Sequence, residues 1–158
     1  MALVLTTTAF PAGGGIPATY TCDGADVSPA LAWSGVPAGT AALALIVDDP
    51  DAPSGTWVHW VLFNLPGTLS ALPEGVPKTD APAGLGGALQ GRNDFRRIGY
   101  GGPCPPPGKP HRYFFKLYAL DAALPLKSGA TKQDVERAMR GHVLAEASLM
   151  GTYARQRR

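Results

Sequence analysis

The chain has 158 residues, of which 45% are apolar and 16% are charged, and its formal net charge at neutral pH is +2. This length predicts one domain over residues 1–158 that can bury a core without extra cross-links. The small net charge argues against a nucleic-acid partner. No apolar run approaches the roughly 18 residues of a transmembrane segment.

Strand and turn signals alternate along the chain. Short apolar runs are separated by segments rich in the 20 glycines and 16 prolines. The runs fall within residues 3–10, 18–24, 28–40, 41–49, 56–67, 96–102 and 111–121. Strands at this spacing are typical of a β-sandwich or a barrel, and we expect a mainly β, antiparallel β-sandwich with one or two short helices near the C-terminus.

The expected helical structure lies late in the chain. Within residues 129–142, Thr131 is a plausible N-cap, Asp134 follows three residues on, and apolar residues recur at helical spacing. Residues 142–155 predict a short helical turn followed by a last strand around Leu149–Tyr153. The segment Leu69–Asn93 is long and poor in apolar residues, so we expect it to be a functional or mobile loop that forms no packed element.

The N-terminus has no basic region followed by the long apolar run of a secretory leader. We therefore expect a cytoplasmic protein in which Cys22 and Cys104 are reduced. Both cysteines lie in Gly- and Pro-rich loops that could approach each other, so a disulfide is the less favoured alternative.

Titratable groups lie among apolar residues in three strands. Because side chains alternate across a strand, each group shares a face with the apolar residues two positions away. These sets are Asp49 with Leu43, Leu45 and Val47; His59 with Trp57, Val61 and Phe63; and His111 and Tyr113 with Phe115, Leu117 and Ala119, while Arg112 and Lys116 face the other way. The ordinary alternative is that the histidines are satisfied core residues and that Asp49 serves a turn.

If the three strands are neighbours, these groups meet at one rim of the core, where apolar walls and a few polar groups form a ligand pocket. Protonated His59 and His111, the Tyr113 hydroxyl and backbone N–H groups of residues 99–102 would suit phosphate or sulfate. Asp49 would orient one imidazole. The proline run at residues 105–107 would fix a loop over the pocket.

Two rival chemistries use the same region. The two histidines and Asp49 could form a facial metal triad, but no short ligand spacing supports it, and no metal or other cofactor is predicted. A hydrolase would need a nucleophile beside a base. Ser28, Ser54 and Cys104 are the candidates, and none lies in a nucleophile motif.

The motifs D-P-D-A-P (49–53), W-V-H-W (57–60) and G-Y-G-G-P-C-P-P-P-G-K-P-H-R-Y (99–113) follow C-D-G-A-D-V-S-P-A-L-A-W (22–33). In this order they resemble the phosphatidylethanolamine-binding protein family, also called the Raf kinase inhibitor protein family, and most closely its bacterial and archaeal branch. The resemblance runs from about Tyr20 to the C-terminus. It implies an antiparallel β-sandwich with a small pocket at one end for phosphate-type groups, including the phosphoryl head of phosphatidylethanolamine.

The resemblance also implies a set of ligand-binding residues. They are Asp49, Asp51, Trp57, His59, Gly102, Pro103, His111 and Tyr113. Four of them, Asp49, His59, His111 and Tyr113, agree with the strand alternation. The resemblance adds Asp51, as a brace for its turn, and it also adds the backbone of Gly102–Pro103.

Two features depart from many eukaryotic members of that family. Those members carry a histidine doublet after the tryptophan, where this chain has Val58, and they continue past the last strand with a helix over the pocket. We expect a non-enzymatic binding protein for a small anion or phosphorylated ligand, a regulator or inhibitor of a kinase or protease, with a hydrolase as the alternative. A homodimer would cover the apolar rim of a more open pocket.

Overall fold

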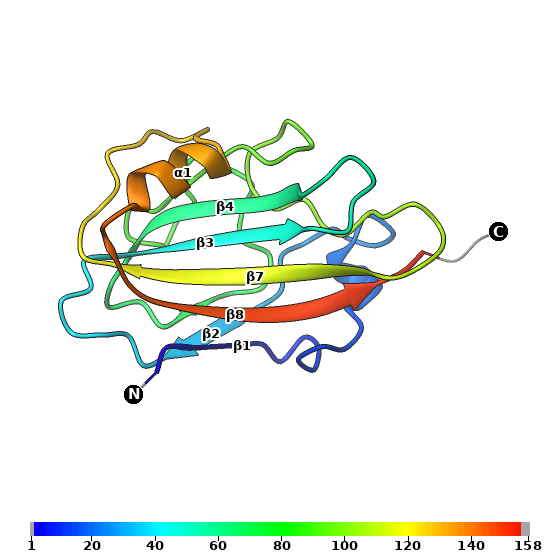
Figure 1. The fold of residues 1–158 in the computed structure, drawn as a ribbon, viewed down its shortest axis with the longest axis horizontal. Coiled ribbons are helices and arrows are strands. Elements are labelled where there is room, and N and C mark those ends of the chain that lie inside the picture. Colours follow the sequence, from blue (N-terminus) through cyan, green and yellow to red (C-terminus); the bar gives the residue numbers. More distant parts are fainter. Residues whose placement is uncertain (1, 156–158) are drawn as a thin grey trace.

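The computed structural model describes residues 2–155 and contains two antiparallel sheets that pack face to face (Figure 1). The smaller sheet has the order β1-β2-β5, and the larger sheet has the order β6-β4-β3-β7-β8. The strands are β1 (Val4–Thr6), β2 (Leu31–Ser34), β3 (Ala42–Asp49), β4 (Trp57–Pro66), β5 (Ala71–Leu72), β6 (Leu89–Gln90), β7 (His111–Leu120) and β8 (Val143–Tyr153). The expected mainly β, antiparallel fold is confirmed.

Only two short helical segments accompany the sheets among residues 2–155. They are the 3-10 turn η1 (Ala18–Tyr20) and the α-helix α1 (Lys132–Met139). As expected, Thr131 caps α1: its hydroxyl accepts from the Asp134 amide at 3.2 Å, and Asp134 accepts from the Thr131 amide at 3.0 Å. No helix in this part of the chain is both long and apolar enough to cross a membrane.

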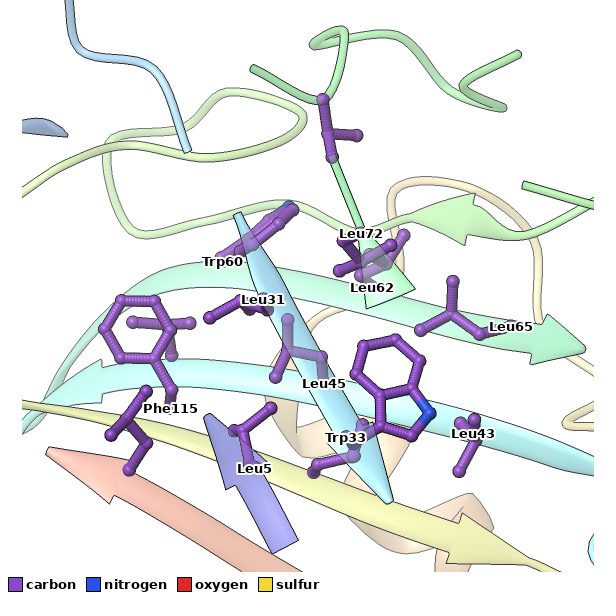
Figure 2. Close-up of a cluster of buried hydrophobic side chains, with 14 of the residues drawn as sticks. Leu5, Leu31, Trp33, Leu43, Leu45, Trp60, Leu62, Leu65, Leu72 and Phe115 are labelled. Atoms are coloured by element: carbon purple, nitrogen blue, oxygen red, sulfur yellow. The ribbon is translucent and has the colours of Figure 1, made fainter. Parts of the chain in front are cut away.

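Two hydrophobic clusters cover the two faces of the larger sheet. The main cluster fills the space between the sheets, where Leu5 and Trp33 of the smaller sheet meet Leu45 and Phe115 of the larger one (Figure 2). The second cluster lies between the outer face of the larger sheet and α1. All eight residues of the central strand β3 are therefore buried, including the two aspartates at its end.

The C-terminal strand is longer than expected. β8 pairs with β7 from His111↔Tyr153 to Leu120↔Val143, so the helical turn that we expected after His142 is wrong. Ala145, Ala147 and Leu149 pack on the main core, whereas the residues between them are exposed. This two-residue period is that of a strand, and pairing along β7 overrides the local preference for helix.

The segment Leu69–Asn93 packs more tightly than expected. It contributes β5 and β6, and it buries Leu72, Val76 and Leu85. The buried Gln90 side chain joins it to the core by accepting from Trp60 Nε1 at 2.7 Å and donating to two carbonyls of the segment, at 2.7 and 2.8 Å. The Gln90 side chain thus satisfies three polar groups at once, which helps to hold in place a segment that has few apolar residues.

Candidate functional site

A cavity of about 230 Å³ opens at the end of the sandwich where β3 stops and β4 and β7 start. Five of the eight predicted ligand-binding residues line it, and they are Asp49, Trp57, His59, His111 and Tyr113. The structure therefore brings the two imidazoles, the carboxylate and the phenol together. Asp51, Gly102 and Pro103 do not line this cavity.

His59 reaches the cavity because of a β-bulge. Val47 pairs with Trp60, and Asp48 pairs with Val58, so His59 is an extra residue in β4 with no partner of its own in β3. A bulge of this kind changes which side chains point to a given face.

The bulge corrects one expectation for β4. His59 shares its side of the sheet with Trp57, as expected, and both line the cavity. Val61 and Phe63 instead belong to the cluster under α1. The expectation that all four share a face is wrong, because strict alternation does not continue through a bulge.

The surroundings of His59 favour the neutral form of its ring. Its Nδ1 lies 2.6 Å from the Gly101 carbonyl oxygen, which can only accept, so Nδ1 carries the proton and Nε2 is the acceptor. Burial lowers the pKa of His59 below its usual value, although the hydrogen bond to Gly101 and the charge of Asp49 partly oppose this. Burial thus opposes the cationic form of His59 that we expected beside a carboxylate or a bound anion.

His111 has an acidic partner. Its Nδ1 donates to Asp49 Oδ2 at 2.7 Å, and the two side chains are only 11% and 4% exposed. Asp49 thus orients one imidazole, as the sequence suggested. The Tyr113 ring lies between the two histidines, with its centroid 5.1 Å from that of His59 and 6.5 Å from that of His111.

Two buried donors in the cavity have no hydrogen-bond partner. They are Trp57 Nε1 and the Tyr113 hydroxyl, and no other buried side-chain nitrogen or oxygen within residues 2–155 is unpaired. Burial, followed by the charge and the closeness of the Asp49 carboxylate, raises the pKa of Tyr113 well above its usual value, so its hydroxyl keeps its proton. Asp49 is an acceptor near this hydroxyl, but no hydrogen bond of good geometry joins the two. Leaving a buried donor unsatisfied costs about 1–3 kcal/mol, so both atoms favour an acceptor from solvent or from a ligand.

Asp51 braces the turn after β3 from outside the cavity. Its carboxylate accepts from Arg112 Nε at 2.9 Å, from Arg112 Nη2 at 2.8 Å and from the Arg112 backbone amide at 2.9 Å. These hydrogen bonds lower the pKa of Asp51 to about 2. The Asp51 amide in turn donates to Asp49 Oδ1 at 2.7 Å, so the brace also helps to hold Asp49 in place.

The peptide unit between Gly101 and Gly102 links His59 to Asp26. Its carbonyl accepts from His59, and its N–H donates to Asp26 Oδ1 at 2.7 Å. The Gly101 amide donates to the His59 carbonyl at 2.8 Å, and the Gly99 amide donates to that of Gly91 at 3.4 Å. The amides of Gly99, Gly101 and Gly102 thus do not face an anion as expected, because each of these three already has an acceptor within the protein.

Close contacts leave no room for a side chain at Gly102, where the neighbour is backbone, whereas at Gly101 the neighbour is the Phe95 ring. A Cβ on Gly102 would lie 2.3 Å from the Tyr20 carbonyl oxygen, and one on Gly101 would lie 2.6 Å from Phe95 Cδ2. Pro103 follows and accepts from the Cys22 amide at 3.1 Å. The G-P step therefore shapes the wall behind the cavity and does not line it.

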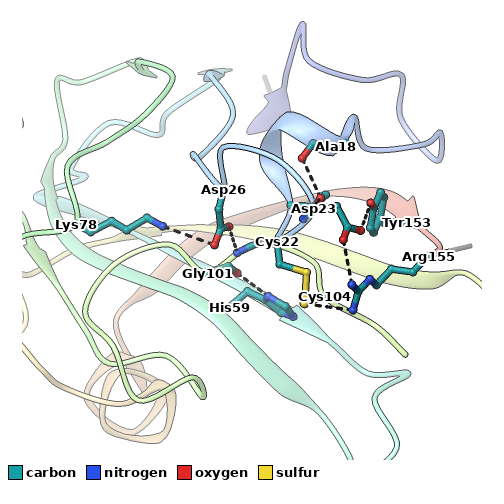
Figure 3. The surroundings of a disulfide bond; sticks show 12 residues. Ala18, Cys22, Asp23, Asp26, His59, Lys78, Gly101, Cys104, Tyr153 and Arg155 are labelled. Atoms are coloured by element: carbon teal, nitrogen blue, oxygen red, sulfur yellow. Dashed lines mark hydrogen bonds and ion pairs between the residues drawn. A yellow bond between two sulfur atoms is a disulfide. The ribbon is translucent and has the colours of Figure 1, made fainter. Parts of the chain in front are cut away.

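Cys22 and Cys104 form a disulfide, so the expectation of reduced thiols is wrong (Figure 3). Cys104 lines the cavity, and Arg155 Nη1 lies 3.9 Å from its sulfur. The two loops also share the hydrogen bond from the Tyr100 hydroxyl to the Tyr20 carbonyl, at 2.6 Å. The fold thus places the two cysteines side by side. The expected reducing compartment carries no information on how close they lie.

Phe95 is a cavity residue that sequence reasoning missed. It lies 37% exposed at the tip of a tight turn, with its ring centroid 5.4 Å from that of His59. Asn93 holds this turn by accepting from the amides of Phe95, at 2.9 Å, and Arg97, at 3.3 Å. An asparagine at the start of a loop is the available signal, since its side chain caps such turns.

The rival chemistries find less support in the side chains. No group of three or more histidine, cysteine or acidic residues within residues 2–155 is arranged to hold a metal ion. Cys104 is bound in the disulfide, and the Ser28 hydroxyl accepts from the Val76 amide at 2.9 Å in the interior. Ser54 is the one proposed nucleophile with an uncommitted side chain that lines the cavity.

Comparisons with known proteins agree with this architecture. A family model described as phosphatidylethanolamine-binding protein matches residues 6–154. A UPF0098 protein of Methanothermobacter thermautotrophicus is 56% identical over 151 residues, which cover 96% of this chain and 98% of the relative. A UPF0098 protein of Aquifex aeolicus is 50% identical over 148 residues, which cover 92% of this chain and 85% of the relative.

Two solved structures are also similar. One is CT736 of Chlamydia trachomatis, described as a putative phosphatidylethanolamine-binding protein homolog, with a TM-score of 0.88, 44% identity, and coverage of 98% of this chain and 99% of that one. The other is YbcL of E. coli, described as a new member of the mammalian family, with a TM-score of 0.92, 36% identity, and coverage of 99% and 100%. The chain, with its two-sheet fold and terminal cavity, belongs to the phosphatidylethanolamine-binding protein family.

Proposed function

We propose that this chain is a non-enzymatic binding protein whose cavity takes a small anion or the phosphoryl group of a larger ligand. The observation that carries the proposal is the pair of unpaired buried donors, Trp57 Nε1 and the Tyr113 hydroxyl, which line one cavity. Phosphate oxygens are strong acceptors of the kind that both donors lack.

The histidines favour a particular form of anion. Neutral His59 offers an acceptor at Nε2, so it suits a ligand that brings its own proton, such as singly protonated phosphate, or one that lets the ring take up a proton. The hydrogen bond from His111 compensates the charge of Asp49, which would otherwise repel an anion.

Calorimetric titration with inorganic phosphate tests the proposal. Tyr113→Phe removes one donor and keeps the ring, so we expect phosphate affinity to fall about tenfold, the effect of one charge-assisted hydrogen bond. Tyr118→Phe is the matched control, because Tyr118 lies on the same strand and pairs with Glu146 of β8 away from the cavity. Equal phosphate binding by the wild type and Tyr113→Phe would reject the assignment.

The enzyme alternative rests on one arrangement. His111 is hydrogen-bonded to Asp49, and the Ser54 side chain lines the same cavity, so a base and a hydroxyl are near each other. Turnover on a panel of ester and phosphoester substrates that disappears in Ser54→Ala would replace the binding proposal with a hydrolase.

Two partner proposals accompany the cavity. An apolar rim that includes Pro53, Phe95 and Pro106 surrounds its mouth, and a second copy of the chain would cover it. A monomeric mass in solution at micromolar concentration would reject this dimer. Inhibition or regulation of a kinase or protease is a further proposal that family membership suggests, and inhibition assays with and without phosphate would test it.

We also propose that the protein lies in the cytoplasm. The state of the two cysteines in cells bears on this proposal. Disulfides are rare in reducing compartments, with hyperthermophiles as an exception. Alkylation of cell extracts under acid quench, followed by mass measurement, reports whether Cys22 and Cys104 are bonded in the native host. Fractionation of the same cells reports where the protein lies.

A further inference from the structure

We propose that a second cavity beside the first is a second anion subsite, so that the ligand is a small molecule with two anionic groups. This inference rests on the proposed function, because the first anionic group occupies the cavity of His59 and Tyr113. The second group would lie against Lys78 and Arg97.

The two cavities adjoin each other. The second has a volume of about 280 Å³, and Phe95 and Cys104 belong to the walls of both. Phe95 is more than one-third exposed, so a flexible linker can pass over its ring from one cavity to the other. The peptide unit of Gly101 and Gly102, whose carbonyl binds His59, forms another part of the second wall (Figure 3).

The charges of the second cavity favour an anion. Its only acidic lining residue is Asp26, which already accepts from the Gly102 amide at 2.7 Å. Lys78 Nζ lies 3.8 Å from Asp26 Oδ2, a long contact that leaves the ammonium group donors to spare. The Arg97 guanidinium makes no hydrogen bond or ion pair with any side chain in residues 2–155, so this wall carries a net positive charge with unused donors.

Both cations come from segments that are held in place. The turn that carries Arg97 is fixed by the buried Asn93 side chain, which also donates to the Gly99 carbonyl at 2.9 Å. Lys78 follows Pro77, whose carbonyl accepts from Gln90 at 2.7 Å. A site whose backbone is already ordered loses less entropy when a ligand binds.

Calorimetry with short α,ω-alkanediol bisphosphates of increasing chain length, each compared with the matching monophosphate, tests the proposal. We expect one chain length to bind at least about tenfold more tightly than its monophosphate, because the second phosphate gains a charge-assisted contact within an already bound molecule. In the double variant Lys78→Ala and Arg97→Ala this gain should disappear, while monophosphate affinity stays the same.

The double variant Lys127→Ala and Arg140→Ala is the charge-matched control, since both residues are exposed and lie outside both cavities. This control should retain the full gain in affinity of the bisphosphate over its monophosphate. If monophosphates bind but no bisphosphate binds better, or if the gain survives the loss of Lys78 and Arg97, the second subsite is wrong and the proposed function stands. If monophosphates fail to bind the wild type, both fail. Tighter binding of a phosphopeptide than of every bisphosphate would assign the two cavities to a protein ligand and overturn the small-molecule proposal.

Discussion

Asp48 and Asp49 are neighbours in sequence and are almost equally buried, at 1% and 3% exposure, but they face opposite sides of β3. Asp48 Oδ2 accepts from Lys116 Nζ at 3.1 Å and from Lys132 Nζ at 2.7 Å, so a structural ion cluster ties α1 to the sheet. Asp49 has a histidine as its partner, beside a cavity. Two lysines thus hold Asp48 away from the cavity, whereas a histidine holds Asp49 beside it, so we expect Asp48 to serve stability and Asp49 to serve the proposed binding as well.

The largest expected effect comes from Asp48→Asn. This change leaves two lysines facing a neutral amide, and we expect the free energy of unfolding to fall by about 3 kcal/mol, near the low end for a broken buried pair because both ammonium groups reach solvent. Phosphate affinity should not change. Denaturant unfolding and calorimetry measure the two quantities. Asp121→Asn is the control, since its pair with His142 is nearly half exposed and should contribute little.

Asp49→Asn should lower both the free energy of unfolding and the affinity for phosphate. It replaces a charge-assisted hydrogen bond to His111, so we expect a loss of about 2 kcal/mol in the free energy of unfolding. The His111 ring also loses the partner that fixes its orientation, so phosphate affinity should fall as well. A variant that lost stability but bound phosphate normally would mean that Asp49 serves only the fold, as Asp48 does.

The next effect is a dependence of sulfate binding on pH. Because burial holds the pKa of His59 below its usual value, binding of a divalent anion that brings no proton should draw a proton onto the ring. Sulfate affinity should therefore rise as pH falls from about 7.5 to about 5.5, by no more than about tenfold per unit for one proton. NMR titration of the His59 ring should show its pKa rising when sulfate is added.

Asp51→Asn should have the smallest effect. The Asp51 and Arg112 side chains are 29% and 52% exposed, so solvent screens their pair and we expect a loss below about 1 kcal/mol. The folded pKa of Asp51, about 2, lies below the unfolded value of 3.8, so the wild type should lose this stability as pH falls through that window. Acid unfolding of the wild type and the variant should converge near pH 2.

Strand alternation predicted much of the fold and part of the site. It placed Asp49, His111 and Tyr113 on the core face of regular strands, because β3 pairs with β7 without interruption up to Asp48↔Phe114 and β7 pairs with β8 from His111 onward. The family motifs identified Trp57, which alternation alone did not single out as a ligand. The roles of these residues were predictable because strand alternation and motifs can both be read from a single sequence.

The remaining features depend on contacts between distant segments. The bulge at His59, the disulfide and the pairing of β8 each require a partner that is 10 or more residues away. The commitment of the Gly102 amide to Asp26, 76 residues away, is of the same kind. Local pattern cannot show such contacts, since it does not say which of several competing acceptors a donor will meet.

The bulge at His59 also has a consequence for the pairing of β3 with β4 in this chain. Because Val58 pairs with Asp48 and Trp60 pairs with Val47, the ladder on either side of His59 is already in step. Removing this one residue would abolish this bulge and leave the pairs next to it in step, whereas removing a residue from the regular part of the strand would reverse the faces beyond it. The position that carries the imidazole is thus the one that the pairing of β3 with β4 does not use at this bulge.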